Sequence, residues 1–168
     1  NTHKTTSTLM QKLDRYDLRI LQALQHNAQI SNQELAEHIG LSASPCSRRV
    51  KALEDAGYIL KHVALLDRKK LGLTLTAYVL IGMDNHTPER FDNFQQQICQ
   101  WSEVLECSLI TGMDADYQLK VIVPDMEHYQ KFLLEKLTRI DGVTSVRSSF
   151  VLNHVQLSTA LPLSHLDL

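Results

Sequence analysis

Hydroxyl and cationic side chains recur at helical spacing within one short segment of this chain. Two serines and two basic residues stand at positions i, i+3, i+4 and i+7: Ser44, Ser47, Arg48 and Lys51. A helix would place all four on one face, with Arg49 at its margin. Serine hydroxyls can bond phosphates or base edges, and arginine can pair with guanine through two hydrogen bonds. The face therefore has the chemistry to enter the major groove of DNA; the alternative is a solvated surface of a three-helix bundle.

A capping box predicts the helix that precedes this face. The Ser31 hydroxyl can accept a hydrogen bond from the amide of Glu34, whose carboxylate can reach back to Ser31. Gly40 would end the helix, because glycine readily adopts the left-handed conformation found there. An earlier helix is predicted from Leu13 to about Asn27, where leucines recur at three-residue spacing.

The helix with the basic face is predicted to begin with Ser44 as N-cap and Pro45 as its first residue, a position that needs no amide proton. Only Gly40–Ser42 separates it from the helix before. Two helices joined by a tight glycine turn, the second with a basic face, make a helix-turn-helix. We therefore expect a flexible arm over residues 1–12 and a helix-turn-helix domain over residues 13–60.

The second half of the chain alternates strands and helices. Segments rich in Thr, Tyr, Val and Ile predict four strands, at Leu73–Met83, Val104–Ile110, Tyr117–Val123 and Val143–Leu152. Helices are expected after Pro88 and over Met126–Ile140. This βαββαβ order predicts a ferredoxin-like sheet with both helices on one face, so the fold class is α+β. Residues 73–168 would form this domain, and residues 61–72, which hold a charged break, a linker strand or hinge.

Composition limits the classes of protein that fit. Hydrophobic residues make up 43% of the chain and charged residues 21%, so it can bury a core. No apolar run approaches the roughly 20 residues of a membrane span, and the polar segment Asn1–Thr8 does not resemble a secretory signal. The net charge of −2 divides into +4 over residues 1–72 and −6 over residues 73–168. This asymmetry suggests two modules with different partners, one of them polyanionic.

Catalytic and metal-binding functions find little support in the sequence. Cys107, His154 and Asp116 could in principle cooperate in catalysis, but no nucleophile–base spacing, GxGxxG, P-loop or HExxH motif is present. Three cysteines without metal-ligand spacing fit reduced thiols in the cytosol, and Cys46 fits a buried core position. The strand that starts at Tyr117 lacks the aromatic pattern with which RNA-binding sheets stack bases. We therefore expect neither an enzyme nor an RNA-binding module, and no metal or cofactor.

Taken together, the motifs resemble the Lrp/AsnC family of transcriptional regulators. The matching segments are LDRYD at 13–17, ISN at 30–32, LSASPC at 41–46, RVKALE at 49–54 and TGMDADY at 111–117. The resemblance implies a winged or extended helix-turn-helix, a ligand-sensing domain of the RAM type, amino acids as effectors, and location in a bacterial or archaeal cytoplasm on the nucleoid. It also implies dimers that assemble into octameric rings. The bare face of the predicted sheet independently suggests a dimer, since it needs a cover.

Two sets of binding residues follow from these interpretations. Those expected to contact double-stranded promoter DNA are Ser31, Asn32, Ser42, Ser44, Pro45, Ser47, Arg48, Arg49 and Lys51. The family's effector pocket lies between RAM domains, near the loop that joins the second and third strands. The residues expected to bind the effector, on this loop or near it, are Leu109, Gly112, Met113, Asp114, Asp116, Tyr117, Met126, Ser148 and Ser149.

The chemistry of the loop suits an amino acid. Glycine lets a ligand approach the backbone, whose amides can bind a carboxylate. Asp114 or Asp116 can pair with an ammonium group, although both aspartates could instead merely shape a turn. The apolar side chains of Leu109, Met113 and Met126 favour an aliphatic or sulfur-containing amino acid. The predicted function is a sequence-specific transcriptional regulator controlled by such an effector, and the alternative is an architectural DNA-binding protein with no effector.

Overall fold

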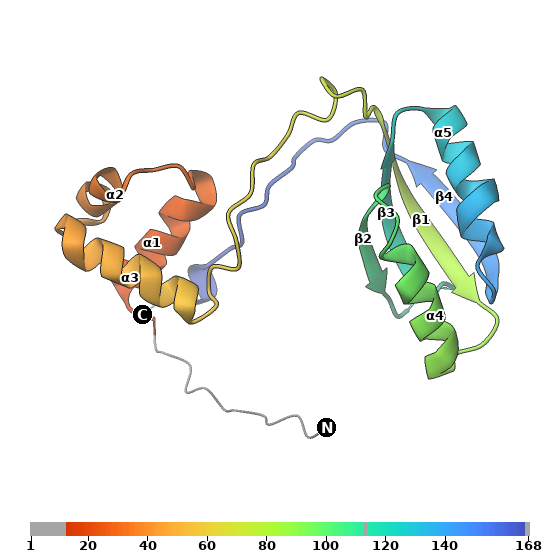
Figure 1. Cartoon of the computed structure of the whole chain (residues 1–168), viewed down its shortest axis with the longest axis horizontal. Coiled ribbons are helices and arrows are strands. Elements are labelled where there is room, and N and C mark those ends of the chain that lie inside the picture. Colours follow the sequence, from red (N-terminus) through yellow and green to blue (C-terminus); the bar gives the residue numbers. More distant parts are fainter. Residues whose placement is uncertain (1–12, 113, 167–168) are drawn as a thin grey trace. The chain divides into compact units, whose positions relative to one another are not determined.

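Three helices form the first part of the computed structural model, which describes residues 13–112 and 114–166 (Figure 1). Helix α1 spans Arg15–His26, α2 spans Asn32–Ile39 and α3 spans Ala43–Asp55. The predicted arm over residues 1–12, and Met113 of the predicted effector loop, lie outside the described residues.

The caps of the first two helices follow from the sequence. Asp14 is the N-cap of α1 and forms a capping box with Asp17. The predicted box at the start of α2 is confirmed, because Ser31 Oγ accepts from the Glu34 amide at 3.2 Å and the Glu34 carboxylate accepts from the Ser31 amide at 3.0 Å. Gly40 ends α2 with φ of +78°, the left-handed conformation that glycine adopts without strain.

Helix α3 begins earlier than predicted. Ser42 is its N-cap, so Ser44 and Pro45 are its second and third residues. The prediction of Ser44 as the cap is wrong because amides throughout the first turn lack acceptors within the helix, and proline is therefore acceptable at its third position too. Cys46 is fully buried, as expected, in a core shared by the three helices: Ile20, Leu35, Ala36, Ile39, Cys46 and Leu53.

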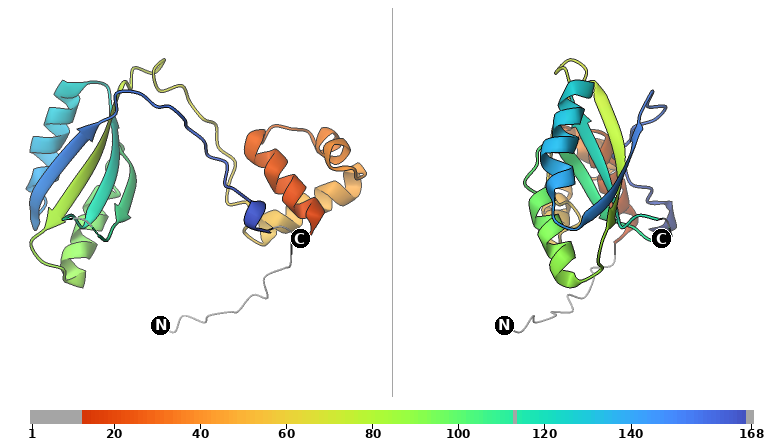
Figure 2. Two further views of the ribbon diagram at one scale, coloured as in Figure 1. Left: turned by 180° about the vertical axis from the view of Figure 1, so that it is seen from behind. Right: turned by 90° about the vertical axis from the view of Figure 1, so that its right-hand side faces the viewer.

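The second part is the predicted ferredoxin-like domain. Its four strands are β1 (Leu75–Met83), β2 (Val104–Leu109), β3 (Tyr117–Val123) and β4 (Val143–Phe150). They pair antiparallel in the order β2-β3-β1-β4. Helix α4 (Pro88–Ile98) and helix α5 (Met126–Lys131) cover one face of the sheet (Figures 1 and 2).

Alternation along the strands decides which side chains meet the helices. On β3, Tyr117, Leu119, Val121 and Val123 are buried, as the period-2 pattern predicted. Between them, Gln118 on β3 faces the opposite side and is exposed, as is Tyr78 on β1. The sheet therefore has one covered face and one face that no other described element covers.

The second helical segment is wound less regularly than predicted. After α5 the chain continues as a π-helical turn, Phe132–Lys136, and a 3₁₀ turn, Leu137–Arg139. The Thr138 hydroxyl donates to the carbonyl of Leu133 at 3.0 Å, which supplies a partner where the regular ladder is interrupted. A uniform helix over Met126–Ile140 is thus wrong in its winding, although most of the segment is helical.

Two segments bear on the predicted domain plan. Residues 60–66 pair with no described backbone of this chain, and a charged turn follows over residues 67–72, so the linker strand or hinge over residues 61–72 stays a prediction. The described residues divide into unit 1, residues 13–64 with 156–166, and unit 2, residues 65–112 with 114–155. The predicted domain over 73–168 therefore loses its tail to unit 1. There the Gln25 side-chain amide donates to the Leu161 carbonyl at 3.3 Å and accepts from its amide at 2.6 Å.

Candidate DNA interface and effector site

The face of α3 predicted to read DNA is open to solvent. Its polar members are all exposed: Ser44, Ser47, Arg48 and Lys51. Neither Arg48 nor Lys51 forms an ion pair within the described part of the chain. On the other side of the helix, Cys46 and Leu53 are buried and anchor it to α1 and α2. The helix therefore presents two free cations and two hydroxyls on a rigid support.

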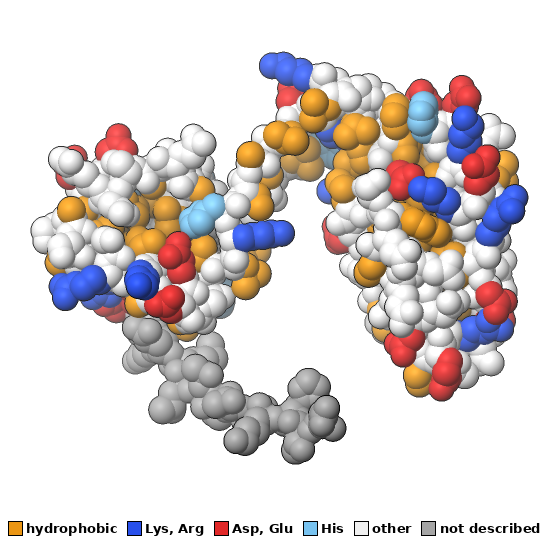
Figure 3. Space-filling model, viewed as in Figure 1, with side chains coloured by type: hydrophobic (Ala, Val, Ile, Leu, Met, Phe, Trp, Pro, Cys, Tyr) orange, Lys and Arg blue, Asp and Glu red, His pale blue; other side chains and the backbone are white. Residues whose placement is uncertain are grey.

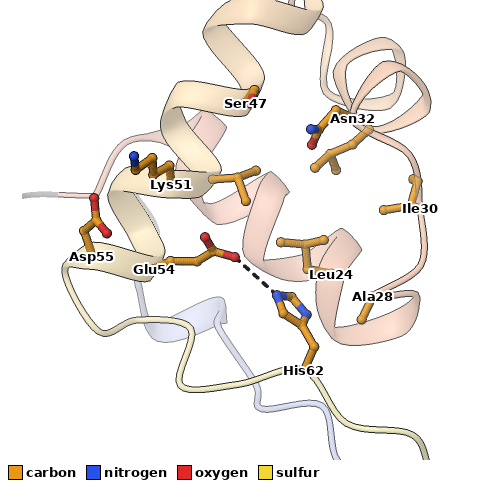
Figure 4. Close-up of a pocket in the computed structure, with 11 residues that line it drawn as sticks. Leu24, Ala28, Ile30, Asn32, Ser47, Lys51, Glu54, Asp55 and His62 are labelled. Atoms are coloured by element: carbon orange, nitrogen blue, oxygen red, sulfur yellow. Dashed lines mark hydrogen bonds and ion pairs between the residues drawn. The ribbon is translucent and has the colours of Figure 1, made fainter.

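Helices α2 and α3 bring several predicted residues to one hollow. Asn32 at the start of α2 and Ser47 and Lys51 on α3 line a cavity of about 390 Å³ (Figure 4). Glu54 closes one side, where its carboxylate lies 3.3 Å from Nε2 of His62. Polar groups from both helices thus lie around one hollow.

The hydroxyls at the two helix starts have different roles. Ser31 Oγ donates to the Glu34 carboxylate at 2.8 Å, and this bond with the one from the Ser31 amide lowers the pKa of Glu34. Ser31 is therefore committed to its cap, whereas the hydroxyl of Ser42 makes no capping bond. Pro45 is half-buried. Of these three, Ser42 is the one whose polar side chain remains available to a phosphate.

Arg49 does not belong to the exposed basic face. Its Nη1 lies 2.8 Å from a carboxylate oxygen of Asp14 and 2.8 Å from one of Asp17. The bond to Asp17 raises the pKa of Arg49. One step of about 100° around the helix from Arg48 turns Arg49 toward α1, where it ties α3 to the capping box, and its contact with DNA stays a prediction.

Replacing Arg49 with alanine is expected to lower the free energy of unfolding of unit 1 by about 1–2 kcal/mol. The Asp17 side chain is 8% exposed and would lose its charged partner. Solvent screening keeps the loss at the lower end, because the Arg49 side chain is 34% exposed. Urea unfolding followed by native-state hydrogen exchange of α1 and α3 amides measures the change.

Lowering the pH should reduce the difference in the free energy of unfolding between the wild type and Arg49→Ala. Burial opposes ionisation of Asp14, but the amides of Asp17 and Tyr16 and the Arg49 guanidinium outweigh it and lower its pKa below the ordinary 3.8. The stabilisation is therefore complete above pH 3.8 and is lost as the pH falls below it. Arg49→Lys, which keeps the charge, is the control. Equal stability of the wild type and Arg49→Ala at neutral pH would contradict the assignment.

The loop between β2 and β3 is held by three neighbouring segments. Asp116 Oδ2 accepts from the Met83 amide at 2.7 Å, and Oδ1 lies 2.7 Å from Nε2 of His86. The Asp116 amide donates to the carbonyl of Ile81 at 2.7 Å. Nη2 of Arg147, on β4, donates to the Asp114 carbonyl at 2.7 Å. These bonds fix the loop against β1, β4 and the segment before α4.

Two predicted effector residues remain open on this loop. Gly112 is exposed with φ of +88°, a conformation that favours glycine. Asp114 is exposed, and its carboxylate makes no hydrogen bond or ion pair with residues 13–112 or 115–166. Asp116 has both oxygens engaged, so the structure gives it a loop-shaping role and leaves Asp114 as the free carboxylate.

Three other predicted effector residues lie elsewhere. Tyr117 is 1% exposed under α4, where its hydroxyl accepts from Gln95 at 2.9 Å. Met126 follows the far end of β3, so the whole length of that strand separates it from the loop. Ser148 points toward α5 and hydrogen-bonds the hydroxyl of Tyr129. Strand alternation and strand direction separate these residues from the loop within one chain, so their contact with an effector stays a prediction.

Leu109 and Ser149 are exposed, so both remain accessible to an effector. Leu109 ends β2 next to the loop and is 57% exposed, and Ser149 is exposed on the uncovered face. Sequence reasoning missed His86 and Arg147, which contact the loop directly. The contact of His86 could have been expected from the βαββαβ order, since the end of β1 and the start of β3 lie side by side at one end of the sheet. The contact of Arg147 could have been expected from the alternation of side chains along β4.

The described residues offer neither a metal cluster nor a membrane span. No group of three His, Cys, Asp or Glu side chains within residues 13–112 and 114–166 is placed to hold a metal ion. No helix in the described part of the chain is long and apolar enough to cross a membrane.

Comparisons with known proteins match both units. Residues 76–161 match the model of the Lrp/AsnC ligand binding domain, and residues 13–59 match a winged helix-turn-helix DNA-binding model. The Bkd operon transcriptional regulator of Pseudomonas aeruginosa is 40% identical over 92% of this chain and 100% of its own. The leucine-responsive regulatory protein of Escherichia coli is 41% identical over 89% of this chain and 90% of its own.

A solved structure agrees with these relatives. A transcriptional regulator of Neisseria meningitidis, crystallised with L-methionine, superposes with a TM-score of 0.88 at 40% identity, over 92% of this chain and 99% of that one. These relatives are regulators rather than enzymes. With a DNA-binding unit and a ligand-binding unit in the order of its relatives, the chain belongs to the Lrp/AsnC family of transcriptional regulators.

Proposed function

We propose that this regulator binds promoter DNA through the exposed face of α3 and senses a leucine- or methionine-like amino acid at the loop between β2 and β3. The observation that carries the proposal is the difference between the contacts of the two aspartates in that loop. Asp116 uses both carboxylate oxygens to hold the loop, while Asp114 is left exposed and unpaired beside Gly112. A free carboxylate next to an open backbone can hold the ammonium and carboxylate groups of an amino acid.

Within one chain, fewer residues than predicted lie where they could form the apolar side of the proposed effector site. Leu109 remains beside the loop, whereas Met126 of the same chain follows the far end of β3. The neisserial regulator was solved with L-methionine and covers nearly all of this chain, which supports a sulfur-containing or aliphatic ligand. An architectural role without an effector is the alternative, and it gives the unpaired Asp114 no function.

We propose assembly into dimers and then octamers because apolar side chains and unpaired backbone remain exposed. Leu60, Val63, Leu65 and Leu66 are between 61% and 90% exposed in a segment whose backbone has no pairing partner in the described residues (Figure 3). Exposed apolar residues and unpaired extended backbone mark sites for another chain. We propose that a second copy covers this segment and the open face of the sheet, and that the assemblies act on the nucleoid in the cytoplasm.

Calorimetric titration with the twenty amino acids is expected to show leucine or methionine binding at least tenfold more tightly than aspartate, glutamate or lysine. The physical reason is that an apolar side chain gains by leaving water, whereas a charged one would lose hydration beside Leu109. Light scattering with and without the best ligand reports the assembly state. Tight binding of charged amino acids alone would contradict the proposed specificity, and no binding by any would favour the architectural alternative.

A further inference from the structure

Two of the three cysteines of the chain belong to unit 2, at the end of α4 and on β2. Cys99 is the C-cap of α4 and is exposed, whereas Cys107 is half-buried on β2. Neither residue belongs to those proposed to bind DNA or an amino acid. The third, Cys46, is fully buried in unit 1. Unit 2 therefore has one thiol that meets solvent and one that is partly shielded from it.

Hydrogen bonds fix the side of α4 on which Cys99 lies. Its amide donates to the Gln95 carbonyl at 3.0 Å, so Cys99 stands one helical turn beyond Gln95 on the same side of the helix. The Gln95 side chain donates to the hydroxyl of Tyr117 on β3 at 2.9 Å. This side of α4 therefore adjoins the part of the sheet in which Tyr117 lies.

The strand register places Cys107 next to the same part of the sheet. Tyr117 pairs with Leu109 on β2, and Leu119, two residues further along β3, pairs with Cys107. Leu119 is fully buried, and Cys107 packs against the same core. Cys107 therefore lies on the side of the sheet that the helices cover, not on the open face.

The two cysteines are displaced from the Gln95 contact by similar lengths in one direction. The step from Gln95 to Cys99 advances about 6 Å along α4. The step back from Leu109 to Cys107 covers about 6.6 Å along β2. Because the chain reverses its direction in the short turn between α4 and β2, both steps lead toward that turn. Cys99 and Cys107 therefore come side by side where the chain passes from the helix to the strand.

The acidity of Cys107 agrees with this placement. Burial, together with the charge of a neighbouring Cys99 thiolate, raises the pKa of Cys107 to about 11. At pH 7 only about one Cys107 thiol in ten thousand is then ionised. Oxidants react with the thiolate and with accessible sulfur, so Cys107 stays a thiol while the exposed Cys99 meets the oxidant first.

We propose that Cys99 and Cys107 form an oxidation-sensitive pair, which a hydroperoxide converts into an intramolecular disulfide that ties the end of α4 to β2. The Cys99 sulfur first attacks one peroxide oxygen. A sulfur–oxygen bond forms as the oxygen–oxygen bond breaks, which leaves a sulfenic acid on Cys99 and releases an alcohol, or water from hydrogen peroxide.

The second step closes the disulfide. The Cys107 sulfur attacks the Cys99 sulfur, the sulfur–oxygen bond breaks, and the displaced hydroxide leaves as water with the proton of the Cys107 thiol. The two thiols together lose two electrons, and one hydroperoxide is reduced. The fold favours this step over reaction between two molecules because it holds the two sulfurs side by side.

The position of Cys99 also suits the geometry of the bond. A disulfide requires Cα atoms about 4.4–6.8 Å apart. Cys99 follows the last residue of α4, Ile98, which is buried and anchors the helix in the core. A small backbone shift beyond Ile98 can therefore bring Cys99 to Cys107 and leave the rest of α4 in place.

The test treats the reduced full-length protein with hydrogen peroxide and maps its cysteines by mass spectrometry. A protease that cleaves after glutamate separates Cys99 from Cys107, because Glu103 and Glu106 lie between them. The expected result is that the two peptides remain joined by a bond that dithiothreitol breaks, while the buried Cys46 is still a free thiol. The experiment needs neither DNA nor effector, so its outcome is independent of the proposed function.

Two variants assign the roles of the two sulfurs. Cys107→Ser lacks the second thiol, so the Cys99 sulfenic acid should accumulate, and dimedone, which traps sulfenic acids, should label it about tenfold more than in the wild type. Cys99→Ser should form no disulfide and should leave Cys107 a free thiol under the same treatment. Circular dichroism checks that both variants are folded.

Three results would contradict the proposal. The first is wild-type protein in which Cys99 is oxidised but its peptide is not joined to that of Cys107. The second is a disulfide between two copies of the chain, visible as a dimer on a non-reducing gel. The third is equal dimedone labelling of Cys99 in the wild type and in Cys107→Ser, which would show that Cys107 does not react with the sulfenic acid.

Discussion

Replacing Arg48 with alanine is expected to weaken binding to a target duplex by roughly 5- to 150-fold, the equivalent of about 1–3 kcal/mol. Arg48 is exposed on α3 and has no ion-pair partner in the described residues, so its guanidinium is free to form two hydrogen bonds with a guanine. The loss should be larger for the target than for a scrambled sequence, because base contacts carry the sequence information. Anisotropy with a duplex selected by the wild-type protein from a random library measures both.

The neighbouring arginine provides the control for this experiment. Arg49→Ala removes the same charge from the same helix, but its guanidinium binds Asp14 and Asp17. It should therefore lower stability while leaving the ratio of target to scrambled affinity unchanged at a temperature where unit 1 is folded. Unchanged target affinity in Arg48→Ala, with a normal far-ultraviolet circular dichroism spectrum, would show that another face of the unit reads DNA.

Replacing Asp116 with alanine is expected to lower the affinity for the amino-acid effector roughly 5- to 150-fold, without changing DNA affinity in the absence of effector. The substitution leaves the buried amide of Met83 without its acceptor, and an unsatisfied buried donor costs about 1–3 kcal/mol. It also removes the partner of His86. The loop should then sample conformations that cannot bind ligand, which lowers the apparent affinity.

Two further variants separate positioning from contact. Asp116→Asn keeps an oxygen that can accept from the Met83 amide, so it should recover much of the effector affinity. Asp114→Asn removes the free charge but leaves the loop bonds intact, so it should lose affinity for the ammonium group while loop amides keep wild-type hydrogen exchange. Calorimetry and hydrogen exchange measure these outcomes. Full effector binding in Asp116→Ala would place the site elsewhere.

Local features of this protein were predictable because their partners are close in sequence. The capping box of Ser31 and Glu34 and the glycine stop at Gly40 depend on bonds across three or four residues. The buried alternation of β3 and the βαββαβ order likewise follow from periodicity. The motifs together were enough to recognise the family, because several weak matches at fixed spacings are specific in combination.

Other features depend on which elements lie side by side. Arg48 and Arg49 are identical in type and adjacent in sequence, yet the carboxylates of Asp14 and Asp17 engage one and leave the other free. Met126 and Tyr117 were predicted in the effector site because of their residue types. In the structure Met126 follows the far end of β3, and the alternation along β3 buries Tyr117. His86 and Arg147 had no motif, and only the antiparallel register of β1, β3 and β4 brings them to the loop.

The sequence by itself therefore determined the order of the main helices and strands, the family and the chemistry available to each unit. The tertiary structure decided which charges remain free to bind a ligand. The physical reason is that a charged side chain satisfied within the fold, like Arg49 or Asp116, has little left to offer a partner. One without a partner among the described residues, like Arg48 or Asp114, is free to pair with a group outside the chain. That distinction depends on contacts between residues distant in sequence, which residue spacing does not encode.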